Sequence, residues 1–426
     1  MQTIYVYINL NAEFVPAGIM STHQEGNYGY STFQYGHRYL ERIDAVPIDP
    51  VALPLSTIEF QTPEYLILFG GIRDAAPDSW GRYLLDRESG KPLTEFDYLV
   101  RAGLDRVGAL GFGPNPINGP VRFTAANTTT SSFSQENLNL DDLIFAAEKY
   151  MENDEEIDKR LQVFSEYGSS FGGARPKALA NYNGRSWLAK FADKGDSRSE
   201  TRIEYANMAL AKKCGITVPE IEHATVVSNR NVFLIERFDR YWINEAKYRI
   251  HFVSGLTMLG EHESYVVQID TERHSYGSLA DIIRRYGAHD FIEKDLEELF
   301  RRMVYNAICS NSDDHLKNHG FLYDQQAKGW RLSPAYDIVP DKNPHGQLGL
   351  GVGPAGRNAG FDNIRRGAGR FGLNRDDAEY IIGEMCSITQ NWQSFFETCR
   401  VPKTDIEKLQ HNFSQSTRPL RGPGLA

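Results

Sequence analysis

The sequence predicts an α+β protein in three parts: a β-rich N-terminal domain at 1–125, a small α/β segment at 126–245 and a larger, all-α segment at 246–426. Three observations predict this fold class. The length of 426 residues is typical of two or three domains. A stretch rich in Ser, Thr and Asn at 124–135 has the composition of a linker. Short strand-like runs dominate before Tyr241, whereas helical periodicity dominates after it.

The N-terminal domain is predicted from short strands and one helix. Ile4–Leu10 and Val121–Phe123 have the apolar composition of strands, and Asp78–Asp86 is predicted to be helical. The turn-rich segment 113–120, Gly-Pro-Asn-Pro-Ile-Asn-Gly-Pro, separates this domain from the rest of the chain. Because Met1–Ile8 alternates like a strand and lacks a basic leader, we expect no signal peptide.

The α/β segment is predicted from two strands with a helix between them. The strands are Arg185–Phe191 and Val232–Ile235. Thr201-Arg-Ile-Glu204 matches a capping box that begins the helix, and Gly215 ends it. The buried stripe of this helix is predicted to contain Ile203, Ala206, Leu210 and Cys214.

Helices account for most of the remaining chain. Leu138–Tyr167 is predicted to be an acidic helix with a solvated face. The apolar spacing across Leu296–Ala307 predicts one face of a buried helix, and further helices are predicted near Asp377–Cys399 and Asp405–Phe413.

Composition and charge restrict the class of protein. Hydrophobic residues make up 41% and charged residues 24%, which is typical of a soluble globular chain. The net charge of 46 − 56 = −10 should repel nucleic acid, so DNA contact requires a local patch or a basic partner. The four cysteines form no C-x-x-C pair, and no run of eighteen apolar residues occurs. We therefore expect a cytoplasmic protein that does not span a membrane.

The most informative motif is Asn311-Ser-Asp-Asp-His-Leu-Lys-Asn318, which precedes Ser333-Pro-Ala-Tyr-Asp337 in the chain. Phosphoryl transfer from ATP needs one Asp to orient the acceptor hydroxyl, and an Asn and a second Asp to hold Mg²⁺. Asp313 and Asn318 have the spacing of the D-x-x-x-x-N loop of protein kinases, although the preceding His-Arg is missing. A solvated polar loop would give the same short pattern.

A kinase also needs a lysine for the nucleotide phosphates, held by a glutamate from the next helix. Lys190 at the end of its strand and Glu204 on the next helix have this order. Alternatively, Glu204 only closes the capping box and Lys190 only flanks a strand. The order of all five candidate residues, together with a small α/β segment before a larger helical one, favours a two-lobed kinase-like fold.

The candidate phosphate loop is Gly168-Ser-Ser-Phe-Gly-Gly-Ala-Arg-Pro-Lys177. Its glycines let backbone N–H groups approach anionic oxygens, and Arg175 and Lys177 add positive charge. A plain glycine turn is the simpler alternative. Gly168-x-Ser170-x-Gly172 also matches the nucleophile elbow of serine hydrolases, but the strand–turn–helix context of that elbow is not predicted here.

Two further motifs have less specific interpretations. His315 and His319 are four residues apart, but Leu316 replaces the glutamate of a zinc-binding H-E-x-x-H, so support of Asp313 is favoured over a zinc site. The stretch Gly356–Gly372, rich in glycine and arginine, is predicted to be a mobile surface loop, with contact to phosphate or a partner as the alternative.

Together, these motifs resemble the HipA family of bacterial serine/threonine kinase toxins. The matching segments, in family order, are Ser170–Lys177, Ile235-Glu-Arg-Phe-Asp-Arg240, Ser312–Asn318 and Pro334–Ile338. Gly71–Arg82 resembles part of the N-terminal domain of the family.

The resemblance implies a role for each candidate residue. Asp313 is expected to be the catalytic aspartate, with Asn318 and Asp337 as ligands of Mg²⁺ and Lys190 on the phosphates of ATP. The segment 236–238 is the expected hinge, which binds adenine through its backbone. The other expected nucleotide-binding residues are Glu204, Gly172, Gly173, Ala174, Arg175, Lys177, Glu236, Phe238 and His315.

The resemblance also implies autophosphorylation of Ser170 in the phosphate loop, with the neighbouring Ser169 as an alternative acceptor. A phosphate adds about −1.5 to −2 charges, which would repel ATP from the loop and inactivate the enzyme.

Partners are implied by the same resemblance. A helix-turn-helix antitoxin (HipB-like) is expected, with operator DNA bound mainly through it, and an aminoacyl-tRNA synthetase is a candidate substrate. The location would be cytoplasmic, and at the nucleoid when the complex is on DNA. A serine hydrolase using Ser170 and a non-catalytic corepressor with a kinase fold are the alternatives.

Overall fold

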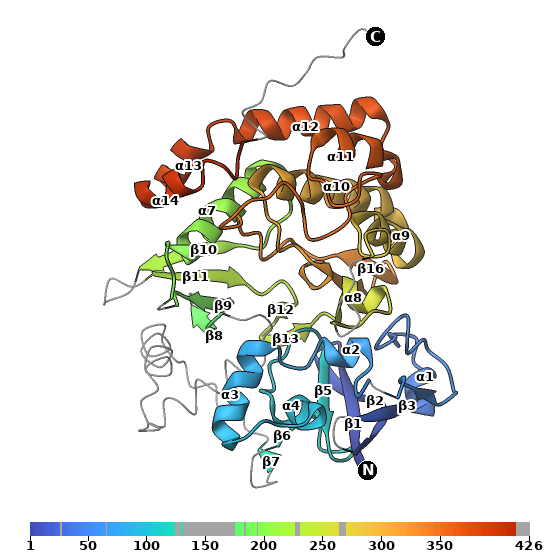
Figure 1. Cartoon of the computed structure of the whole chain (residues 1–426). Helices are drawn as coiled ribbons and strands as arrows, with labels where there is room; N and C mark the ends of the chain where they lie inside the picture. The colour runs from blue at the N-terminus through green and yellow to red at the C-terminus, as the bar shows by residue number, and fades with distance from the viewer. Residues whose placement is uncertain are drawn as a thin grey trace.

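The computed structural model describes residues 1–25, 28–64, 66–123, 129–130, 175–182, 185–193, 195–225, 231–263 and 270–414. The predicted linker at 124–135 lies almost entirely outside these ranges, and the predicted acidic helix at 138–167 lies wholly outside them. In the described part, a β-rich N-terminal region lies at one end of the molecule and most helices lie at the other (Figure 1).

The N-terminal region is built on an antiparallel five-stranded sheet with the order β4-β3-β2-β1-β5. Its strands are β1 (Gln2–Leu10), β2 (Glu13–Glu25), β3 (Tyr28–Tyr35), β4 (Phe60–Gln61) and β5 (Leu110–Gly113). Its helices are α1 (His37–Leu40), α2 (Gly70–Arg73), α3 (Ser79–Ser89) and α4 (Glu95–Arg101), and the short strands β6 (Arg122–Phe123) and β7 (Thr129–Thr130) come next in the chain. Burial of Val6, Ile8, Phe33 and Phe112 gives this region its own core.

The second sheet has the order β10-β11-β9-β8, and among the described residues a helix packs on β10 and β11. The elements are β8 (Lys177–Tyr182), β9 (Arg185–Phe191), α7 (Glu200–Lys213), β10 (Ile221–Thr225) and β11 (Asn231–Glu236). The predicted strands and the buried stripe of the helix are confirmed. The capping box is wrong, because Ser199 is the N-cap and Glu204 instead binds a lysine of the sheet.

Helices dominate the rest of the chain, as predicted. They are α8 (Gly255–Met258), α9 (Tyr276–Tyr286), α10 (Ile292–Cys309), α11 (Phe361–Gly367), α12 (Arg375–Thr389), α13 (Trp392–Thr398) and α14 (Lys403–Lys408), with 3-10 turns η2 (His289–Phe291), η3 (Leu316–Asn318) and η4 (Ala368–Phe371). The prediction that this part is all-α needs a correction. A three-stranded sheet of β14 (Phe252–Ser254), β15 (Gly320–Asp324) and β16 (Gly329–Leu332) lies within it.

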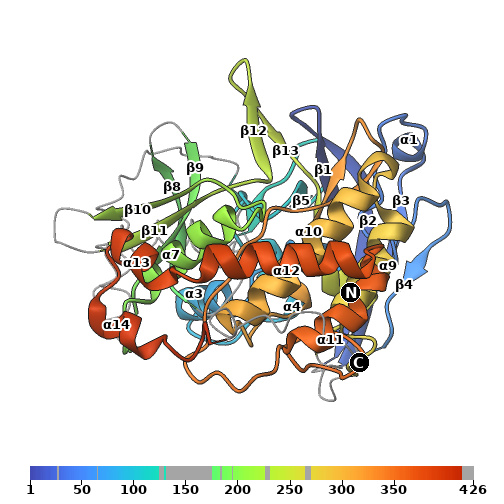
Figure 2. The ribbon, with the colours of Figure 1, turned by 90° about the horizontal axis from the view of Figure 1, so that it is seen from above.

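A hairpin of β12 (Arg240–Ile243) and β13 (Ala246–Arg249) connects the second sheet to the helical part and projects from the body of the molecule (Figure 2). Beyond it, the second sheet and the helices share one large core, in which Ile203 and Phe233 belong to the same cluster as Phe300 and Met303. The fold class is therefore confirmed: a mixed α and β protein with a β-rich N-terminal region and a helical C-terminal part.

The stretch Gly356–Gly372 is not a surface loop throughout. It forms α11 and η4, and Ile364, Ala368 and Phe371 are buried in the core. Among the described helices, none combines the length and the apolar composition needed to cross a membrane.

Candidate active site

Lys190 lies at the centre of the candidate site. It occupies the buried end of β9, where its Nζ atom donates to Glu204 of α7 at 2.5 Å and to Asp337 at 2.7 Å. Burial alone would lower the pKa of Lys190, but the two carboxylates raise it above its ordinary value, so the side chain is a stable ammonium. Lys190, Glu204 and Asp337 therefore form one ion-pair network.

The two carboxylates differ in their surroundings. Glu204 is buried, and burial raises its pKa. The side chain of Asp337 is 47% exposed, and the ammonium of Lys190 holds its pKa below the usual range. Glu204 therefore holds Lys190 from the protein interior, while the side chain of Asp337 is accessible to solvent.

The backbone of Asp337 is strained. Its φ of 59° lies in the left-handed region, which non-glycine residues rarely occupy. The preceding Tyr336 holds this conformation in place, since its hydroxyl donates to the carbonyl of Lys317 at 2.7 Å and its ring stacks on Phe238. Such strain persists where the surroundings fix it, and it is common at functional sites.

The candidate catalytic loop begins where α10 ends at Ser310, a C-cap in the left-handed region. Asp314 is buried, and its Oδ2 atom accepts from the hydroxyl of Tyr276 and lies 2.9 Å from Nε2 of His319. The neighbouring Asp313 is exposed. Burial of the one aspartate thus anchors the loop and leaves the other at the surface of the site.

Asp313 lies within electrostatic reach of the lysine–carboxylate cluster. Partial burial raises its pKa above the usual range, the positive charge of His315 opposes this, and Asp337 adds to it. His315 also lowers the pKa of Asp337. Asp313, His315 and Asp337 therefore share one electrostatic environment.

Asn318 and Asp337 offer oxygen ligands to a hard cation. Within the described ranges, the side-chain amide of Asn318 and the Oδ2 atom of Asp337 have no hydrogen-bond partner, so both are available. No group of three or more His, Cys, Asp or Glu side chains able to hold a metal occurs among the described residues. These residues fit Mg²⁺, which takes few protein ligands and completes its shell with water and substrate phosphates.

Only the end of the predicted phosphate loop, from Arg175 onwards, is described. Nη1 of Arg175 donates to Asp196 at 2.9 Å, and Lys177 is buried beside Lys190, where burial lowers its pKa to about 8. Ser169, Ser170, Gly172, Gly173 and Ala174 lie outside the described residues, so the serine nucleophile of the hydrolase alternative lies outside them as well.

The predicted hinge is partly used by the protein itself. The amide of Glu236 donates to the carbonyl of Glu220 at 2.8 Å, and the amide of Arg237 donates to Ser186 at 3.0 Å. The carboxylate of Glu236 pairs with Arg185 instead of facing the site. Phe238 stacks on Tyr336, which directly precedes the candidate metal ligand Asp337.

Comparison with known proteins identifies the family. A family model described as the HipA-like C-terminal domain matches residues 169–392, more than half of the chain. The chain belongs to the HipA family. Among solved structures, HipA of Shewanella oneidensis MR-1, in a complex with HipB and its operator DNA, matches with a TM-score of 0.64 at 15% identity. The match covers 97% of this chain and 95% of that one, and it shows a shared fold.

Curated relatives of this HipA-family chain carry kinase names. A "putative kinase" of Haemophilus influenzae is 27% identical over 141 residues, which cover 32% of this chain and 40% of that protein. "Putative kinase Y4dM" of Sinorhizobium fredii is 24% identical over 274 residues, which cover 61% of this chain and 58% of that protein. The chain thus spans about half the length of the curated relatives it matches.

Sequence reasoning missed two parts of this HipA-family site. Neither the anchoring of Asp314 by Tyr276 and His319 nor the polar contacts of Asp105 with the hinge was predicted. The pair His315/His319 was predicted to support Asp313 rather than to bind zinc. His319 is instead buried against Asp314, whereas His315 is exposed. The adjacent Asp-Asp pair was the available signal, since Asp313 is exposed and Asp314 is buried.

Proposed function

We propose that this chain is an ATP- and Mg²⁺-dependent serine/threonine protein kinase that acts as the toxin of a toxin–antitoxin pair. The observation that carries the proposal is the contact of Lys190 with both Glu204 and Asp337, at 2.5 Å and 2.7 Å. A kinase needs a strand lysine that is held by a helix glutamate, and an aspartate that binds Mg²⁺ at the same nucleotide phosphates. The contacts of Lys190 bring these three residue types together. The family membership and the kinase names of the relatives support it.

In this proposal, each charged side chain of the site has a separate role. Lys190 binds the phosphates of ATP and is held in place by the buried Glu204. Asp313 accepts the proton of the attacking hydroxyl and orients it, because its carboxylate is exposed beside Asp337. Bound by Asn318 and Asp337, Mg²⁺ would neutralise charge on the migrating phosphoryl group.

The nucleotide would lie between the two lobes. Phe238 offers its backbone to the adenine, while Arg175 and Lys177 add positive charge near the phosphates. We propose that Gly172, Gly173 and Ala174 supply backbone N–H groups, and that Ser170 or Ser169 is the autophosphorylated residue, whose added charge would expel ATP. The domain boundaries 1–125, 126–245 and 246–426 remain part of the proposal; separate N-terminal and C-terminal cores support the first division.

The proposed partners are inferred from charge and from the structural relative. The HipA structure from Shewanella holds HipB and operator DNA. Because this chain carries a net charge of −10, we propose that a helix-turn-helix antitoxin supplies most DNA contacts here. A protein substrate such as an aminoacyl-tRNA synthetase, and a cytoplasmic location with nucleoid association in the complex, belong to the same proposal.

The test is incubation of the purified chain with labelled ATP, Mg²⁺ and a cell lysate, and then identification of the labelled proteins. Wild type should label itself and at least one lysate protein. Asp313→Gln and Asp337→Asn should abolish both signals, whereas Asp44→Asn, at a surface pair with Arg42, should leave them unchanged. Retention of labelling by either active-site variant would contradict the proposal.

The two alternative functions, a serine hydrolase and a non-catalytic corepressor, predict different results in such assays. A serine hydrolase would cleave an ester substrate without ATP. A corepressor with a kinase fold would assemble with the antitoxin but fail to bind Mg-ATP. Phosphopeptide mapping with label only outside 165–177 would reject Ser170 and Ser169 as acceptors.

A further inference from the structure

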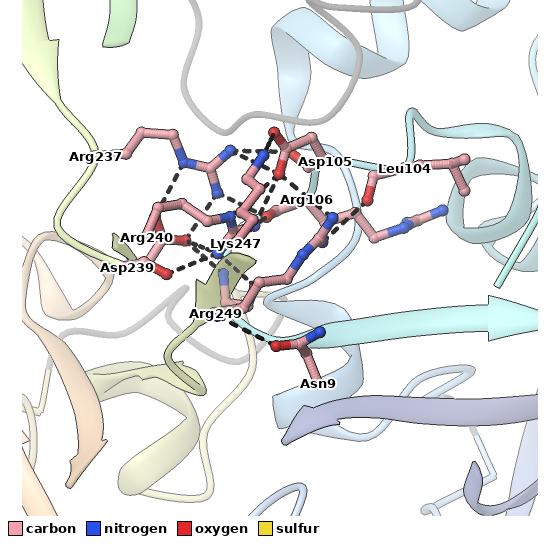
Figure 3. A network of polar contacts seen from close by, with 10 residues as sticks. Asn9, Leu104, Asp105, Arg106, Arg237, Asp239, Arg240, Lys247 and Arg249 are labelled. Atoms are coloured by element: carbon pink, nitrogen blue, oxygen red, sulfur yellow. Dashed lines mark hydrogen bonds and ion pairs between the residues drawn. The ribbon is translucent and has the colours of Figure 1, made fainter. Parts of the chain in front are cut away.

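A cluster of charged side chains joins the hinge to the N-terminal region (Figure 3). It is centred on Asp105, in the loop between α4 and β5, and on Asp239, just after the predicted hinge. The cations around them are Arg237, Arg240, Lys247 and Arg249. Most of these groups are buried: the side chains of Arg237, Arg240 and Arg249 are 4%, 0% and 3% exposed.

Asp105 is the carboxylate that connects the cluster to the N-terminal region. Its oxygens lie 3.0 Å from Arg240, 2.6 Å from Lys247, 3.2 Å from Arg237 and 3.6 Å from Arg249. Although burial alone would raise the pKa of Asp105, these four cations hold it well below its usual range. The carboxylate is therefore charged at neutral pH.

Backbone groups of the same loop complete the attachment. Nη2 of Arg237 donates to the carbonyl of Arg106 at 2.8 Å, and Nη1 of Arg240 donates to the carbonyl of Gly108 at 2.8 Å. In the opposite direction, the amide of Gly108 donates to Asp239 at 2.7 Å. Gly108 has φ +74°, and a Cβ there would meet the backbone of Phe252 at 3.1 Å, so the loop conformation depends on glycine.

The attachment fixes the residues on both sides of Phe238. Arg237 and Asp239 bind each other at 2.8 Å and both contact the loop at 105–108. Phe238 between them stacks on Tyr336, with ring centroids 5.8 Å apart. The loop of the N-terminal region thus holds the short segment on both sides of Phe238.

We propose that Asp105 is a positioning residue for nucleotide binding: by holding Arg237 and Arg240, it fixes the backbone around Phe238 against which the adenine packs. This inference rests on the proposed kinase function. Without the carboxylate, Lys247 and Arg249 would lose the ion pairs that they form with Asp105. Arg237 and Arg240 would keep Asp239, but the cations of the cluster would repel one another more strongly. The hinge would then sample other positions, while Lys190, Asp313 and Asp337 would keep their own contacts.

The test measures binding and catalysis in the full chain. Isothermal titration gives the Kd for Mg-ATP. Initial rates of autophosphorylation at varied ATP give the KM for ATP and, as kcat, the maximal rate of the first phosphorylation. Asp105→Asn should raise Kd and KM about tenfold, a change typical of residues that act through a neighbouring element. Its kcat should stay within about twofold of wild type, since the loss concerns binding of the base and not the transferred phosphate.

Asp295→Asn is the matched control. Asp295 is also buried and binds an arginine in two places, at 2.8 and 2.9 Å, but its partner Arg331 lies in the three-stranded sheet of the C-terminal part. It should lose stability while its KM for ATP stays at the wild-type value. If Asp105→Asn does not fold, Asp105→Glu keeps the charge and displaces the carboxylate by one methylene, and its KM should rise less but in the same direction.

Two results would overturn the inference alone: a wild-type KM for the Asp105 variant that folds, or equal changes of kcat and KM in the Asp105 and Asp295 variants. If wild type itself does not bind Mg-ATP, the proposed function fails, and the inference fails with it.

Discussion

At the level of single residues, the site combines groups whose protonation is set by different causes. Lys190 and Asp337 stabilise each other's charges across 2.7 Å. Asp313 has no such counter-charge within hydrogen-bond distance among the described residues, and burial raises its pKa. A base with a raised pKa suits proton transfer better than an ordinary aspartate, because its affinity for the proton is closer to that needed at neutral pH.

This difference predicts the pH dependence of the reaction. As pH falls, Asp313 should take up a proton at a higher pH than an ordinary aspartate, so the acid limb of kcat/KM should lie above pH 3.8. His315→Asn removes a positive charge that lowers the pKa of Asp313, so the acid limb should move to still higher pH. The measurement is the pH–rate profile of both proteins; a shift to lower pH in the variant would contradict this role of His315.

Asp314 should matter for stability more than its neighbour. Asp314→Asn leaves His319 and Tyr276 without the carboxylate that both contact, in an environment where Asp314 is 3% exposed. We expect a loss of about 3 kcal/mol in the free energy of unfolding, the usual effect of breaking a buried charged contact. Urea denaturation measures it. Asp362→Asn, at a side chain that is 98% exposed, should change stability by less than about 0.5 kcal/mol.

At the level of whole elements, two helices of similar length begin differently. α12 begins at Asn374, which accepts from the amides of Asp376 and Asp377 in a complete capping box. α7 begins at Ser199, whose side chain makes no capping bond; its amide instead donates to Asp405 of α14 at 2.8 Å. The start of α7 therefore depends on a tertiary contact, and the start of α12 on local sequence.

Replacing the two caps should distinguish these cases. Asn374→Ala removes both capping bonds and should cost about 1 kcal/mol. Ser199→Ala removes none and should cost less than about 0.5 kcal/mol. Thermal denaturation of the two variants gives the comparison, and equal losses of stability would contradict this difference between the two helix starts.

At the level of the whole molecule, the surface charge bears on DNA binding. With a net charge of −10, the chain alone should not retard operator DNA at physiological salt. Addition of a basic helix-turn-helix partner should produce a retarded complex whose affinity falls with increasing salt. Gel-shift titrations with and without the partner test this, and strong retardation by the chain alone would show that a local cationic patch overrides the net charge.

Local patterns predicted the parts of the structure that depend on neighbours in sequence. The strand that ends near Lys190, the buried stripe of α7 and the spacing of Asp313 and Asn318 are all periodic or short-range signals. The capping box failed because Glu204 gains more from the ammonium of Lys190 than from the start of a helix. The strands β14–β16 have three to five residues each, too few for a periodicity to stand out.

The contacts of Asp105 could not be predicted for a different reason. They join residues more than 130 positions apart, such as Asp105 and Arg240, and no spacing within the chain marks such a pair. The segment Ile235–Arg240 was noted only as a match to the family, and the resemblance assigned 236–238 to the nucleotide.

The ammonium of Lys317, in the candidate catalytic loop, lies 2.5 Å from Asp78 at the start of α3 and 3.1 Å from Glu263. A fragment that begins after residue 125, prepared as a minimal catalytic unit, would lose Asp78 and Asp105 together. Five cations that contact these two carboxylates would then be exposed to water without them. They are Lys317, Arg237, Arg240, Lys247 and Arg249. Such a fragment should bind polyanions such as heparin, whereas the intact chain, with its net charge of −10, should not.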